Sequence, residues 1–156
     1  MIRPITTVSA AETRAFGARL ATVLEPGDVV LLIGDLGAGK TELAKGIADG
    51  LGVEETVVSP TFTLAREYEG RVPLVHADAY RLEHAREVAD LDIGERDDAV
   101  TLIEWGNRLS GVLTGTLAID EYLEVWLDGV GDDDREITPV PCGPSWQTRL
   151  ATVVGG

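Results

Sequence analysis

The feature that restricts the fold of this chain most strongly is a glycine-rich turn between a buried strand and a helix. Residues 28–33 (Asp-Val-Val-Leu-Leu-Ile) form a short, continuous apolar run, which predicts a strand buried on both faces of a parallel sheet. Residues 34–41 (Gly-Asp-Leu-Gly-Ala-Gly-Lys-Thr) follow at once and fit the pattern G-x-x-x-x-G-K-[ST]. Apolar residues then recur at helical spacing up to Leu51. A strand, this turn and a helix, in that order, are the structural context of a phosphate-binding loop.

Each residue type in the turn has a physical reason. Glycines let backbone N–H groups point inward around a phosphate, and the helix N-terminus adds donors and a positive dipole end. Lys40 would place an ammonium group on the outer phosphates, and the Thr41 hydroxyl could ligate Mg²⁺. No Asn-Lys-x-Asp element for reading guanine is present, which favours ATP. The predicted phosphate-binding residues are Gly34, Asp35, Leu36, Gly37, Ala38, Gly39, Lys40 and Thr41.

The rest of the chain alternates between predicted helices and strands. Ser9 and Glu12 form an S-x-x-E capping box before a helix expected over residues 10–24. Strands are expected around 62–68, 72–78, 99–103, 117–127 and 135–140, a short helix over 83–91, and a terminal helix or a frayed tail over 146–154. This order predicts an α/β P-loop NTPase fold of three layers, with a mostly parallel central sheet and added antiparallel strands. We expect residues 1–156 to form a single domain, with 141–156 as a variable C-terminal tail.

Two of the predicted strands end in an acid. Asp78 ends the strand over 72–78, and Glu104 follows the strand over 99–103. A phosphate-loop NTPase needs an acidic group for Mg²⁺ at the end of a neighbouring strand, and spacing alone does not choose between these two. His76, two residues before Asp78, is interpreted as a strand histidine with satisfied hydrogen bonds rather than as a catalyst.

A threonine-containing segment, Ser59-Pro60-Thr61-Phe62-Thr63, lies between the loop helix and the Asp78 strand. Switch segments of NTPases occupy this place in the chain. A threonine hydroxyl there could reach Mg²⁺ or a γ-phosphate, and the alternative is the ordinary beginning of a strand. The residues themselves leave both interpretations open.

The chain is strongly acidic, with 13 Lys and Arg against 27 Asp and Glu and a net charge of −14. Direct nucleic-acid binding is disfavoured because neutralising phosphates needs a basic footprint. The longest strictly aliphatic run, residues 29–33, is far too short to span a membrane, and residues 1–4 lack a signal-peptide layout. The single cysteine, Cys142, excludes an internal disulfide and a cysteine metal cluster. We therefore expect a cytoplasmic protein without membrane contact.

Four motifs, taken together, carry a resemblance to a known family. They are residues 34–41, Ser-Pro-Thr-Phe-Thr-Leu (59–64), His-Ala-Asp-Ala-Tyr-Arg-Leu (76–82) and Ile-Glu-Trp (103–105). In order and spacing they closely resemble the TsaE family, the small ATPases of tRNA threonylcarbamoyladenosine (t6A) biosynthesis, over roughly residues 5–140. Residues 110–127 resemble the family only loosely.

The resemblance implies a role for each matching residue. Residues 34–41 would hold the ATP phosphates, and Lys40 would also take part in catalysis. Thr41 and Glu104 would ligate Mg²⁺, Glu104 would also act in catalysis, and Asp78 would be a catalytic acid near the γ-phosphate. The switch segment would contain Thr61, with a catalytic role, and Thr63. Arg135 would touch the nucleotide, and Trp105 would lie near the nucleotide or a partner surface.

The resemblance also implies partners. TsaE proteins associate with TsaB and TsaD, which transfer a threonylcarbamoyl group to adenosine 37 of tRNA. This chain would hydrolyse ATP to reset that complex and would meet tRNA only indirectly. No cis arginine finger is evident, so we expect slow turnover of the chain alone. Two alternatives stay open, namely a small P-loop kinase acting on a metabolite and a nucleotide-dependent scaffold without turnover.

Overall fold

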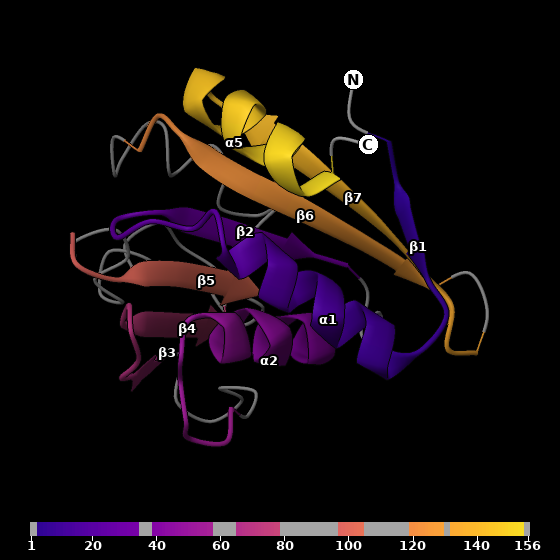
Figure 1. Cartoon of the computed structure of the whole chain (residues 1–156), viewed down its shortest axis with the longest axis horizontal. Coiled ribbons are helices and arrows are strands. Elements are labelled where there is room, and N and C mark those ends of the chain that lie inside the picture. Colours follow the sequence, from indigo (N-terminus) through magenta and orange to yellow (C-terminus); the bar gives the residue numbers. More distant parts are fainter. Residues whose placement is uncertain are drawn as a thin grey trace.

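The computed structural model describes residues 3–34, 39–57, 65–78, 97–104, 119–129 and 132–154. Within these ranges, seven strands form one sheet in the order β1-β7-β6-β2-β5-β4-β3 (Figure 1). The strands are β1 (Ile5–Thr7), β2 (Val29–Ile33), β3 (Ala65–Tyr68), β4 (Leu74–Asp78), β5 (Val100–Glu104), β6 (Tyr122–Gly129) and β7 (Arg135–Cys142). The helices are α1 (Ala10–Ala21), α2 (Lys40–Gly50) and α5 (Pro144–Val154).

The four central strands of this sheet run parallel. β2 pairs in parallel with β5 on one side and with β6 on the other, and β4 pairs in parallel with β5. Antiparallel strands flank them, with β3 on β4 at one edge and with β7 and then β1 beyond β6 at the other. The prediction of an α/β fold with a mostly parallel central sheet and added antiparallel strands is confirmed.

The described helices cover one face of the sheet (Figure 1). Val30, Leu32 and Leu102 point to that face and join residues of α1, α2 and α5 in one hydrophobic cluster. Leu31 points to the opposite face, because side chains alternate along a strand, and it is also fully buried. Burial on both faces explains why β2 has a continuous apolar sequence rather than an alternating one.

Helices α1 and α2 approach each other closely enough for their backbones to touch. A Cβ atom added to Gly46 would lie 2.0 Å from the carbonyl oxygen of Arg14, and one added to Gly17 would lie 2.6 Å from that of Leu43. Only residues without a side chain fit at these two positions. This contact holds α2, whose first turn contains Lys40, against α1.

The ends of α1 and α2 follow the sequence signals. The Ser9 side chain accepts a hydrogen bond from the Glu12 N–H at 3.1 Å, as the capping box predicts, while Glu12 accepts one from Val8 N–H at 3.3 Å. α1 ends at Ala21, earlier than the predicted residue 24. After α2, Gly52 has φ +81°, the left-handed conformation of a glycine that follows a helix.

Other boundaries differ from the sequence predictions. No strand is predicted from the sequence at β1. A strand is expected over 117–127, but β6 begins only at Tyr122, so residues 119–121 lie before it. Of the two alternatives for residues 146–154, the structure has the helix, with Trp146 and Leu150 buried in the core. The helix expected over 83–91 lies outside the described residues. The single-domain organisation and the variability of residues 141–156 stay predictions.

Candidate nucleotide site

Lys40 connects the two ends of the predicted phosphate loop. It is the first residue of α2, its side chain is buried, and its Nζ donates a hydrogen bond to the carbonyl oxygen of Gly34 at 2.7 Å. Gly39 precedes the helix with φ +95°, a conformation that L side chains rarely adopt. The ammonium group and the N–H groups of the first helical turn therefore lie at the end of β2, in the arrangement that suits an anion.

Asp78 and Glu104 lie side by side at the same edge of the sheet. They are Cα partners at the ends of β4 and β5, and Glu104 is in turn the Cα partner of Leu32 in β2. Two residues after Leu32, the chain begins the phosphate loop at Gly34. The carboxyl ends of these parallel strands thus bring both acids to the edge where the loop starts, and ligands bind at such edges in open α/β sheets.

The two carboxylates fit a bound cation. Both side chains are buried, Asp78 at 8% exposure and Glu104 at 4%, and neighbouring strands are about 4.8 Å apart. Paired buried carboxylates repel each other unless a cation compensates their charge. Among the described residues no group of three or more His, Cys, Asp or Glu gathers around one point. Mg²⁺ beside a nucleotide needs only one or two carboxylates, because phosphate oxygens and water complete its shell.

His76 contacts Glu104 beneath this edge. Its Nε2 is 3.3 Å from Oε2 of Glu104, and its side chain is fully buried. The prediction of a histidine within the strand is confirmed, but neither ring nitrogen has the hydrogen-bond partner among the described residues that a satisfied histidine would have. The sequence interpretation did not anticipate its closeness to Glu104, because that depends on the register of β4 against β5.

Arg135 is brought to the phosphate loop from a distant part of the sequence. A Cβ atom added to Gly39 would lie 3.4 Å from Nε of Arg135, so the arginine side chain rests against this glycine. Its Nη1 donates hydrogen bonds to the carbonyl oxygens of Asp132 at 3.2 Å and Asp134 at 2.9 Å, which hold the side chain in place. The structure thus places this predicted nucleotide contact beside the N-terminus of α2.

Several predicted site residues lie outside the described ranges. They are Asp35, Leu36, Gly37, Ala38, Thr61, Thr63 and Trp105. Thr41 is described and lies in the first turn of α2, directly after Lys40. The structure therefore brings Gly34, Gly39, Lys40, Thr41 and Arg135 to one loop, with Asp78 and Glu104 on the neighbouring strand ends.

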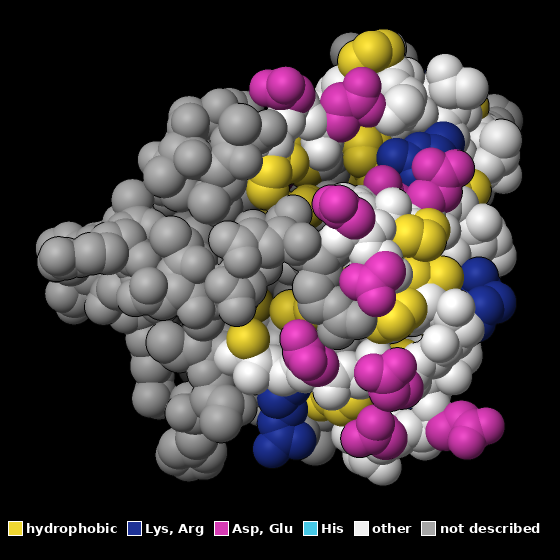
Figure 2. All heavy atoms as spheres, turned by 90° about the vertical axis from the view of Figure 1, so that its left-hand side faces the viewer, with side chains coloured by type: hydrophobic (Ala, Val, Ile, Leu, Met, Phe, Trp, Pro, Cys, Tyr) yellow, Lys and Arg dark blue, Asp and Glu magenta, His cyan; other side chains and the backbone are white. Residues whose placement is uncertain are grey.

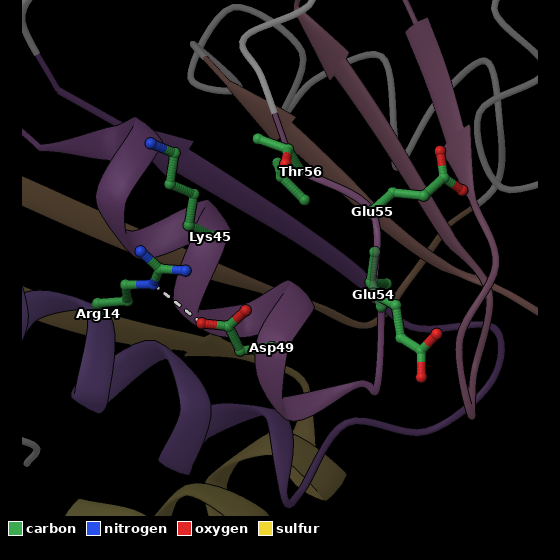
Figure 3. A pocket seen from close by; sticks show the side chains of 8 residues that line it. Arg14, Lys45, Asp49, Glu54, Glu55 and Thr56 are labelled. Atoms are coloured by element: carbon green, nitrogen blue, oxygen red, sulfur yellow. Dashed lines mark hydrogen bonds and ion pairs between the residues drawn. The ribbon is translucent and has the colours of Figure 1, made fainter.

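A separate pocket of about 190 Å³ lies between α1, α2 and residues 53–57 (Figure 3). Arg14 and Asp49 point toward one another across it, with Nε 2.9 Å from Oδ2. Lys45, also at the pocket, lies 3.6 Å from a carboxylate oxygen of Glu42. Because both cations have acidic partners, this pocket is a poorer place for phosphates than the loop at Lys40.

Comparison with known proteins agrees with this geometry. The family model for the threonylcarbamoyl adenosine biosynthesis protein TsaE matches residues 7–137. The chain belongs to the TsaE family. That stretch contains Lys40, Asp78, Glu104 and Arg135, so every described residue of the candidate site lies within the TsaE match.

Bacterial relatives resemble the chain over most of its length. The TsaE protein of Bacillus subtilis is 42% identical over 142 residues, which cover 90% of this chain and 87% of that protein. The TsaE protein of Streptomyces coelicolor is 41% identical over 152 residues, which cover 92% of this chain and 99% of that protein. The crystal structure of Bacillus subtilis YdiB superposes with a TM-score of 0.79 at 34% identity, covering 98% of this chain and 95% of that one.

Proposed function

We propose that this TsaE-family chain acts in tRNA threonylcarbamoyladenosine biosynthesis as a Mg²⁺-dependent ATPase that binds and resets a TsaB/TsaD complex. The observation that carries the proposal is the meeting of Lys40, Asp78 and Glu104 at one edge of the sheet, beside the start of a phosphate loop. The names of its relatives support the pathway. A cytoplasmic location is part of this proposal.

Each residue of the site has a part in the proposed hydrolysis. Lys40 and the N–H groups of the loop bind the β- and γ-phosphates and neutralise charge on them. Thr41 and Glu104 would hold Mg²⁺, which supplies positive charge to the phosphate oxygens. Asp78 orients the attacking water. The water oxygen bonds to the γ-phosphorus as the bond to the β–γ bridging oxygen breaks, leaving ADP, inorganic phosphate and one released proton.

Residues outside the described ranges enter the proposal through the family resemblance. Thr61 and Thr63 are proposed to contact the γ-phosphate, so that its loss changes the surface offered to the partners. Arg135 rests against Gly39 and is proposed to contact the nucleotide from the β7 side. We propose that turnover is slow without the partners.

The charge of the chain supports indirect rather than direct contact with tRNA. The net charge is −14, and on the face that Figure 2 shows, Asp and Glu side chains are spread widely among uncharged groups. Among the described residues on that face, Lys and Arg side chains are isolated rather than gathered into a stripe. Since tRNA binding needs a basic footprint, the proposed partners would hold the tRNA.

Phosphate release by the purified chain, measured alone and with TsaB and TsaD, tests this function. We expect release with ATP and Mg²⁺, faster with the partners, together with more than one round of t6A formation per complex. Release of phosphate at the same rate with and without partners would contradict the partner dependence. A phosphorylated metabolite without free phosphate would indicate a kinase, and nucleotide binding without any release would indicate a scaffold.

A further inference from the structure

His76 is a fully buried histidine to which the proposed reaction assigns no part. Its side chain is 0% exposed. Neither ring nitrogen has a hydrogen-bond partner with good geometry among the described residues. Burying a polar group without a partner costs free energy, and native proteins rarely leave one in this state. The position of this imidazole therefore calls for a physical explanation.

Apolar residues and one carboxylate lie beside His76 on the described strands, and the exposed Arg66 of β3 is its Cα partner on the other side. Its Cα partner in β5 is Leu102, and Leu74, two residues earlier on the same side of β4, belongs to the hydrophobic cluster. The Nε2 atom lies 3.3 Å from Oε2 of Glu104, within ion-pair distance although not aligned as a hydrogen bond. This ion-pair distance makes Glu104 a group that the imidazole can act on.

We infer that His76 is a positioning residue whose Nε2–H holds the Glu104 carboxylate in the orientation that the Mg²⁺–nucleotide site needs. A glutamate side chain has three rotatable bonds, so fixing its carboxylate requires a contact near its end. A carboxylate also has two oxygens, and engaging Oε2 leaves Oε1 for the cation. Groups that hydrogen-bond to a metal-binding carboxylate set its orientation and contribute strongly to metal affinity. The inference rests on the proposed function, because it concerns the same site.

An apolar substitution at His76 should affect Mg²⁺ affinity differently if His76 only fills space than if it positions Glu104. If the imidazole only fills the core, an apolar side chain of similar volume serves as well, because it removes two unsatisfied nitrogens. If the imidazole positions Glu104, an apolar side chain leaves the carboxylate without its contact and lowers the affinity for Mg²⁺. Nucleotide affinity in the absence of Mg²⁺ should not change, because Lys40 and the loop amides supply it.

Calorimetric titration of the full-length chain with ADP, in Mg²⁺ and again in EDTA, measures the two contributions separately. We expect His76→Leu to reduce the affinity gain from Mg²⁺ by about 10- to 100-fold while the affinity in EDTA stays the same. The amide nitrogen of glutamine reaches about as far as Nε2 of histidine, whereas that of asparagine is shorter. His76→Gln should therefore retain most of the Mg²⁺ gain, and His76→Asn should lose it.

Thr101→Val is the matched control. Thr101 is a buried polar residue of β5 whose Cα partner in β4 is Val75, so it points to the opposite face from His76 and Glu104. Its replacement disturbs a buried polar group at similar depth but should leave the Mg²⁺ gain unchanged. Circular dichroism establishes that each variant is folded. If His76→Leu does not fold, the difference between the glutamine and asparagine variants decides the matter.

The possible outcomes separate this inference from the proposed function. If the wild-type chain binds ADP more tightly with Mg²⁺ and His76→Leu keeps that gain, His76 is a core residue and the positioning role is wrong. Equal Mg²⁺ gains in the glutamine and asparagine variants also overturn it. If the wild-type chain shows no gain from Mg²⁺, the proposed Mg²⁺ site fails together with the inference.

Discussion

Asp78 and Glu104 are Cα partners at the last positions of two adjacent parallel strands, and both side chains are buried. Their equivalent places in the sheet do not make them equivalent in chemistry. Glu104 neighbours β2, whose end leads into the phosphate loop, whereas Asp78 is one strand further from it. This order agrees with Glu104 as the proposed cation ligand and Asp78 as the group that orients water.

Isosteric amide substitutions distinguish the two acids. Glu104→Gln and Asp78→Asn should each lower ATP turnover by about 100-fold, the size of effect seen when one preorganised electrostatic group is removed. Only Glu104→Gln should also weaken the binding of ADP in Mg²⁺, because the proposed site assigns the cation to Glu104 and not to Asp78. Phosphate release and calorimetry measure the two effects. The assignment is reversed if Asp78→Asn is the variant that loses Mg²⁺-dependent affinity.

Lys40 and Lys45, the two lysines of the chain, provide a matched pair on one helix. Lys40→Ala should weaken ATP binding by about 10- to 100-fold, because it removes a charge-assisted contact to the phosphates. Lys45→Ala removes the same charge, and the ion pair that it breaks among the described residues is with Glu42, 3.6 Å away on the surface of α2. Such pairs contribute little, so binding and turnover should stay within about twofold. Equal losses in both variants would point to net charge rather than to the loop.

The sequence predicted the parts of the site that depend on local pattern. The continuous apolar run of β2, the glycines of the turn and the helical spacing of α2 all act over neighbouring residues. Parallel pairing then places strand-end acids at the loop edge, so Asp78 and Glu104 could be expected there before their register was known. Because local signals and the global fold agree at this edge, the position of the two acids could be predicted from the sequence alone.

Features that depend on long-range register could not be predicted in the same way. β1 contains only three residues and is a strand because it pairs with β7. The family resemblance implied a role for Arg135, but no local pattern shows that β7 brings it to Gly39, 96 positions away in the sequence (135 − 39). The spacing of His76 and Asp78, two residues apart in one strand, indicates that both side chains point to the same side. The contact of His76 with Glu104 follows only from the offset between β4 and β5.

The backbone contact between α1 and α2 can be tested with a single methyl group. A Cβ at position 46 would lie 2.0 Å from the carbonyl oxygen of Arg14, so Gly46→Ala forces the helices apart despite the higher helix propensity of alanine. We expect a loss of about 1–3 kcal/mol in the free energy of unfolding, measured in urea. Gly129→Ala is the control, since the nearest atom there is 3.9 Å away. Equal stability of the two variants would show that α1 and α2 can move apart at little cost in free energy.

Tyr122, in the pairing of β6 with β7, should make the free energy of unfolding depend on pH in the alkaline range. Burial, with a further contribution from its Cα partner Cys142, raises the pKa of Tyr122 from 10.0 to about 12. Between these values the unfolded chain loses the phenol proton first, so it binds fewer protons and stability falls as pH rises from 10 to 12. Tyr122→Phe removes this contribution, so its urea midpoint should fall less steeply over that window. Urea unfolding of both proteins at pH 8, 10 and 11 measures the difference, and parallel declines would show that Tyr122 ionises as readily folded as unfolded.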